Sequence, residues 1–178
     1  MKRTVILVVF ALLACGITAS AATANGTLAV SATVTGSIAL TFQKDANGPS
    51  ITGAGTGAAT LNFGSVSAWG SQPTGVTSTP NIGAGNFMVS APIDIVITNA
   101  NLTSASAKLQ ASLQSADATN TWAVNGVTVT NGSQATINGT FTYSTGTTGT
   151  SEPIQITIPF TNTTGSVSNT INFTATSN

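Results

Sequence analysis

The chain has 178 residues, with only four Lys or Arg, four Asp or Glu, and no His. Acid–base, nucleophilic and metal chemistry depend on His, reactive Cys or clustered charged groups, so the composition argues against an enzyme, and no catalytic residue, metal or cofactor is expected. Nucleic-acid binding is excluded as well, because neutralising phosphates requires several Lys or Arg.

The first residues have the three parts of an export signal. Lys2-Arg3 is basic, residues 4–14 (TVILVVFALLA) are apolar but too short to span a bilayer, and Ala19-Ser20-Ala21 offers a cleavage site for signal peptidase. We therefore predict a signal peptide at 1–21 and a secreted or cell-surface domain at 22–178, passing through the periplasm if the source is Gram-negative. The domain would have a net charge of about −2 and no transmembrane segment.

Cys15 leaves one alternative open. Leu12-Leu13-Ala14-Cys15 resembles a bacterial lipobox, in which the cysteine is acylated and tethers the protein to a membrane. If the signal is instead cut after Ala21, the only cysteine of the chain is lost and no disulfide can form.

The rest of the chain predicts strands. Apolar residues alternate repeatedly with Thr, Ser, Asn and Gln, whereas no stretch carries a sustained helical period. About eight short strands, each with one apolar face, favour an all-β fold, a single antiparallel β-sandwich. The alternation lies in residues 27–35, 38–42, 59–63, 93–98, 108–113, 122–129, 140–143, 154–161 and 170–175.

Two of these segments carry further signals. Asn125-Gly126 between Trp122–Val124 and Val127–Val129 predicts a tight hairpin with a type I′ turn, since both residues accept a positive φ. Pro159 within 154–161 predicts an edge strand, because proline cannot donate a hydrogen bond to a neighbour.

Residues 44–57, 64–86 and 146–153 are rich in Gly, Pro, Ser and Thr and are expected to be loops. Within the predicted loop 44–57, Asp45-Ala46-Asn47-Gly48 resembles the start of a calcium-binding loop but lacks the later glutamate of that motif. An Asx turn is therefore the favoured interpretation.

Aromatic residues are the remaining route to a ligand, because Trp69, Trp122 and Tyr143 can stack on sugar rings. Trp122 lies on an alternating face and is expected in the core. Trp69, between Ala68 and Gly70 in the long loop, is the better candidate for an exposed ligand-binding aromatic.

Three segments resemble the secreted, pilin-like proteins of the spore coat protein U group. Residues 22–34 (ATANGTLAVSATV) are similar to the segment that follows cleavage in that group, Leu61-Asn62-Phe63-Gly64 to an L-x-F-G strand ending, and residues 165–174 (GSVSNTINFT) to the closing strand. Ile38 stands about where the family usually has a cysteine.

This resemblance implies an immunoglobulin-like sandwich assembled at the cell surface, often by exchange of a donor strand. A segment 22–35 that presents Leu28, Val30, Ala32 and Val34 on one face suits strand addition to a neighbouring subunit. The alternative, slightly favoured, is that this strand pairs within its own sheet.

We therefore expect a structural or adhesive surface protein, such as a fimbrial subunit, whose partners are further copies of itself or other surface subunits. The alternative function is a carbohydrate-binding module that uses Trp69 and loop residues, with glycans as partners.

Overall fold

The computed structural model describes residues 27–162 and 165–178. Contacts divide the chain into two units, residues 1–33 and 34–178. The predicted signal peptide (1–21), Cys15 and the start of the predicted strand 22–35 lie outside the described residues. The part of the chain that the structure describes holds no helix, and so none long and apolar enough to cross a membrane.

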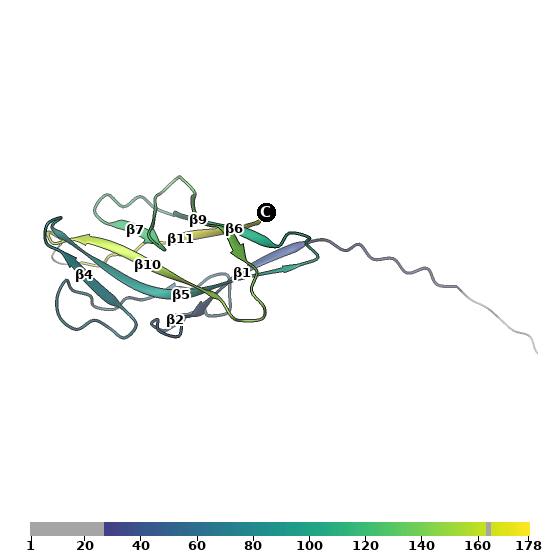
Figure 1. Ribbon diagram of the computed structural model, residues 1–178, viewed down its shortest axis with the longest axis horizontal. Coiled ribbons are helices and arrows are strands. Elements are labelled where there is room, and N and C mark those ends of the chain that lie inside the picture. The colour runs from purple at the N-terminus through teal and green to yellow at the C-terminus, as the bar shows by residue number, and fades with distance from the viewer. Residues whose placement is uncertain (1–26, 163–164) are drawn as a thin grey trace, which may run out of the picture. The chain divides into compact units, whose positions relative to one another are not determined.

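The second unit is an antiparallel β-sandwich, as the alternation predicts (Figure 1). Every pairing between its named strands is antiparallel. The strands are β1 (Ser37–Lys44), β2 (Ile51–Thr52), β3 (Thr60–Leu61), β4 (Thr77–Asn81), β5 (Asn86–Ala100), β6 (Ser106–Leu113), β7 (Thr121–Val124), β8 (Val127–Val129), β9 (Ala135–Thr142), β10 (Thr150–Pro159) and β11 (Ile171–Ser177).

The larger sheet has the order β1-β5-β10-β7-β8, and β4 pairs with the first part of β5. Strand β5 is its centre, because β4 and β1 share one of its sides and β10 occupies the other. Apolar residues at every second position of β5 and β10 give this sheet a continuous inner face. On β5 these positions are Phe87, Val89, Ala91, Ile93, Ile95 and Ile97, all buried.

The smaller sheet has the order β11-β6-β9 and packs on the inner face of the larger one. Leu109 of β6 and Phe141 of β9 are fully buried in the shared core together with Ile95 of β5. The two sheets differ in width, since three strands face a six-stranded sheet. Short strands β2 and β3 form a separate pair, which joins β1 through the bridge between Phe42 and Thr56.

The hairpin predicted at 122–129 is confirmed. Strands β7 and β8 pair with Val124 opposite Val127, and the two turn residues have φ of 50° at Asn125 and 76° at Gly126. Positive φ at both positions is the type I′ geometry that an Asn-Gly pair accepts at low cost.

The prediction of an edge strand from Pro159 is wrong, because β10 lies between β5 and β7. The physical reason is that β7 pairs only with residues 154–157 of β10. Pro159 therefore lies beyond the end of β7, where no neighbour needs its missing N–H.

The prediction of a strand over 27–35 is also wrong. Residues 27–36 form no strand, and the first strand begins at Ser37. Conversely, residues 77–81, which were predicted to be part of the long loop 64–86, form strand β4. Their sequence TSTPN lacks apolar alternation, and the strand is held at the sheet edge by its register with β5.

Candidate functional site

The carboxylates of the described chain are used in turns and in the core. Asp45 accepts a hydrogen bond of 2.7 Å from the backbone N–H of Asn47, and its own carbonyl accepts one of 3.1 Å from Gly48. This is the expected Asx turn. Among the described residues, no three His, Cys, Asp or Glu side chains gather as metal ligands do.

Asp45 and Asp94 lie close enough to influence each other. Hydrogen bonding from Ser151, with that from Asn47, lowers the pKa of Asp45. Burial and the neighbouring Asp45 charge raise the pKa of Asp94. The pair therefore favours a proton on Asp94 while Asp45 stays ionised.

Asp117 anchors the indole of Trp122. Its carboxylate accepts hydrogen bonds from Trp122 Nε1 at 2.8 Å and from the backbone N–H groups of Asn120 at 2.9 Å and Thr119 at 3.0 Å. Trp122 is 5% exposed, so the core position expected for it is confirmed. Only a small part of this side chain is therefore exposed.

Trp69 has the opposite surroundings. It is 62% exposed, in the loop between β3 and β4, and its ring stacks on that of Phe160 with centroids 5.1 Å apart. The exposure predicted for this residue is therefore observed.

The four residues of the predicted donor segment are exposed. Leu28 is 86% exposed, Val30 83% and Val34 72%, and Ala32 is exposed as well. The root of the segment is held, because the Asn101 side chain donates to the carbonyl of Thr35 at 3.3 Å. Exposed apolar side chains at every second position are the pattern with which an added strand fills pockets beside a sheet edge.

Among the described residues, strand β11 pairs only with β6 and leaves its other edge unpaired. The bonds from Gln114 N–H to the Thr170 carbonyl (2.8 Å) and from Asn178 N–H to the Ser106 carbonyl (3.1 Å) fix the pattern. Even-numbered residues of β11 thus bond to β6, since strand backbone groups alternate in direction. The N–H and C=O groups of Ile171, Phe173 and Ala175 point to the open edge.

This edge has none of the usual protection. Charged side chains, prolines and bulges commonly blunt exposed edges, whereas β11 has the sequence INFTATS and pairs with β6 without a register shift. Its inward-facing side chains, Ile171, Phe173 and Ala175, are only half-buried. Strand β11 is therefore a ready template for one more strand.

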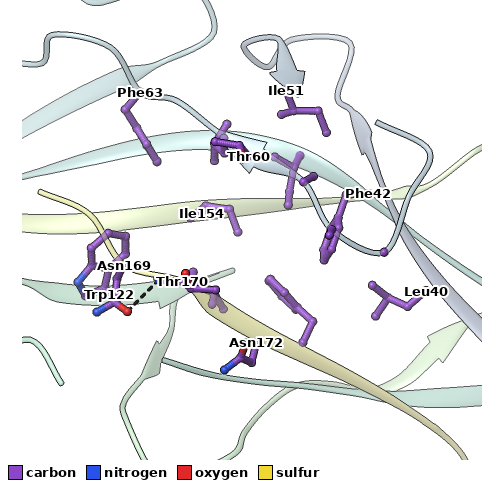
Figure 2. A pocket seen from close by; sticks show the side chains of 17 residues that line it. Leu40, Phe42, Ile51, Thr60, Phe63, Trp122, Ile154, Asn169, Thr170 and Asn172 are labelled. Atoms are coloured by element: carbon purple, nitrogen blue, oxygen red, sulfur yellow. Dashed lines mark hydrogen bonds between the residues drawn. The ribbon is translucent and has the colours of Figure 1, made fainter. Parts of the chain in front are cut away.

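Two adjoining cavities lie between this edge and the wall made by β1 and residues 57–66. Their volumes are about 480 Å³ and about 740 Å³. Both are lined by Leu61, Phe63, Trp122 and Asn169, so they form one groove, hereafter the edge groove. Figure 2 shows the first cavity, with Phe42 and Ile154 directed into it and Phe63 above.

The floor of the edge groove is the inner face of the larger sheet. Ile93 and Ile154 lie under the first cavity, and Phe87, Val89 and Ile158 under the second. These floor side chains are buried, whereas the rim residues Leu40, Leu61, Phe63, Ile171 and Phe173 are half-buried. The groove thus has an apolar floor, left open where the smaller sheet is too narrow to cover its partner, and polar residues such as Asn62, Ser65 and Ser168 line part of the second cavity.

The sequence pointed to the exposed segment 27–35 and to Trp69, but not to the edge groove. Its wall and its template strand come from segments more than a hundred residues apart, around Leu61 and Phe173. The alternation of 170–175 predicted a strand without indicating which of its edges would remain unpaired.

Comparison with known proteins found no matching family model, no matching curated protein and no matching solved structure.

Proposed function

We propose that this chain is an exported, non-enzymatic structural protein of the cell surface, whose copies assemble by β-strand addition. Residues 27–35 of one copy pair with the open edge of β11 in the next copy and lie along its edge groove. The observation that carries the proposal is the exposure of Leu28, Val30 and Val34 in a chain that also has a groove with an apolar floor beside the unpaired edge of β11.

Segment 27–35 and the edge of β11 with its groove match in chemistry and in the two-residue period of their side chains. An added strand presents every second side chain to the core, so Leu28, Val30, Ala32 and Val34 face the groove while its backbone bonds to β11. Nine extended residues span about 30 Å. Neither residues 27–35 nor β11 contains a charged side chain, so no charge is buried by the pairing.

The non-enzymatic part rests on the composition and on how the acids are used. The whole chain contains no His. Asp45 shapes a turn and Asp117 holds Trp122, so these carboxylates have structural partners.

The experiment is size-exclusion chromatography and electron microscopy of the purified protein and four variants. Leu28→Asp and Val30→Asp place a charge on the face that enters the groove, and we expect both to abolish filaments or stable multimers. Ser31→Asp and Thr33→Asp carry the same charge on the opposite face of the same segment and are expected to assemble. Equal behaviour of both pairs of variants would contradict strand addition.

A further inference from the structure

Outside the 27–35 segment, two large apolar side chains of the described residues are exposed, Trp69 and Ile82. The edge groove does not use Trp69, since it lines neither cavity. An exposed indole lacks much of the stabilisation that burial of a large aromatic surface provides. The contacts that hold Trp69 at the surface therefore bear on its role.

Two aromatic rings support the indole from below. Trp69 stacks on Phe160 with centroids 5.1 Å apart and ring planes 25° apart, and Phe160 stacks on Phe87 at 6.2 Å and 11°. Phe87 is 8% exposed and belongs to the core. One face of Trp69 therefore rests on a stack that continues into the sandwich, and the exposed surface is its other side.

The loop around Trp69 is braced by its own polar groups. Ser67 Oγ donates to the Trp69 carbonyl at 2.6 Å, and Gln72 Nε2 donates to the carbonyls of Ser67 at 3.0 Å and Gly70 at 3.2 Å. Ser78 of β4 donates to the Ser67 carbonyl at 2.8 Å and ties the loop to the sheet. A ring held in place before binding loses little conformational entropy when a ligand stacks on it.

The surface around this ring carries no charge. No Asp, Glu, Lys or Arg occurs from Ala46 to Ile93, a stretch that contains the loop, β4, the turn after it and the start of β5. Its polar groups are hydroxyls, amides and backbone groups. A flat aromatic face among neutral hydrogen-bonding groups suits a neutral ring with one apolar face and many hydroxyls, whereas an anionic ligand finds no cation here.

We propose that Trp69, supported by Phe160, is a stacking platform for a neutral saccharide, so that the protein binds a polysaccharide as well as assembling. A protein partner fits less well, because the residues beside Trp69 are Ala, Gly, Ser and Gln and the core of a protein interface is usually rich in large apolar side chains. Trp69 and Phe160 line neither cavity of the edge groove, although Phe87 lies beneath both features, and the test does not depend on assembly.

The experiment uses the indole N–H signals of the two tryptophans in nuclear magnetic resonance spectra of the purified protein. The probes are neutral oligosaccharides (hexamers of β-1,4-linked glucose, N-acetylglucosamine, mannose and xylose), with a galacturonate hexamer as the charged comparison. We expect at least one neutral probe to shift the Trp69 signal while the Trp122 signal, bonded to Asp117, stays unchanged.

Variants then distinguish stacking on Trp69 from nonspecific binding to exposed apolar side chains. Trp69→Ala should weaken binding of that probe at least about tenfold, and Trp69→Phe should weaken it less. Ile82→Ala removes the other exposed apolar side chain, which is 77% exposed, and should bind as the unmodified protein does. The proposal is overturned if no neutral probe shifts Trp69, if only the charged hexamer binds, or if Trp69→Ala alters self-association alone.

Discussion

Two acidic side chains, Asp117 and Glu152, show how differently single residues of this nearly uncharged protein respond to pH. Burial alone would raise the pKa of Asp117, but hydrogen bonds from Asn120 and the Trp122 indole lower it to about 2. Glu152 is 1% exposed, and one oxygen of its carboxyl has no hydrogen-bond partner among the described residues. Burial raises its pKa, against a smaller effect of Asn125.

Asp117 should stabilise the fold at neutral pH and lose this effect in acid. Its pKa is depressed in the folded protein, so its contribution is present above the unfolded value of about 4 and declines as the pH falls toward 2. Asp117→Asn should lower the free energy of unfolding by about 1–2 kcal/mol at pH 7. Urea unfolding of both proteins between pH 6 and pH 2 measures this, and a constant difference over that range would contradict it.

Glu152 should act in the opposite sense. A carboxyl whose folded pKa is raised stabilises the fold when protonated, and this contribution is lost as the pH rises through the folded pKa. Glu152→Gln keeps the shape without the charge, so it should stabilise the protein by about 1–3 kcal/mol at pH 7 and make little difference at pH 3. Thermal unfolding at the two pH values is the measurement, and destabilisation at pH 7 would show that the carboxylate has an essential partner.

At the scale of elements, the sequence predicted best where the signal is local. The Asn125-Gly126 turn, the alternation of β10 and the core position of Trp122 follow from neighbouring residues and agree with the structure. Strand order depends on contacts between residues far apart in the chain, and for this reason the edge position predicted from Pro159 was wrong. Residues 27–35 alternate as a strand does, but they form no strand in the described structure.

The candidate sites were predictable to different degrees for the same reason. The exposure of Trp69 followed from its small neighbours in a loop, whereas its support by Phe160 joins residues far apart in the chain. The edge groove depends on which edge of β11 stays free, and that is decided by the pairing of β11 with β6, a strand about sixty residues earlier in the chain.

The edge of β11 allows a prediction from backbone direction alone. Ala175→Pro removes an N–H that points to the open edge, so the free energy of unfolding should change by less than about 1 kcal/mol while assembly is lost. Thr174→Pro removes an N–H directed at β6 and should cost about 3 kcal/mol or more. Chemical denaturation together with size-exclusion chromatography checks both variants. Similar stability losses in the two would contradict the assigned alternation.

At the scale of the whole molecule, the two features on which the proposed assembly rests occur in one chain. The exposed segment 27–35 has the alternation of a strand, and β11 with the edge groove has a sheet edge that no described strand covers. An apolar groove floor beside an unprotected edge favours association. Trp69 lies outside this arrangement, so binding of a saccharide and assembly would be separable.

The most direct test of the account is a disulfide cross-link between two different copies, in a Cys15→Ser background. One copy carries Ser31→Cys, on the outward face of the segment, and the other Asn172→Cys or Thr174→Cys, on the outward face of β11. Residues that face each other across an added strand lie within disulfide range, so oxidation of the mixture should give a covalent dimer. The control pairs Ser31→Cys with Thr140→Cys on the exposed face of β9 and should give none. Strand addition at β11 would be contradicted if multimers form although Ser31→Cys does not cross-link to Asn172→Cys or Thr174→Cys. It would also be contradicted if the control pair with Thr140→Cys cross-links equally well.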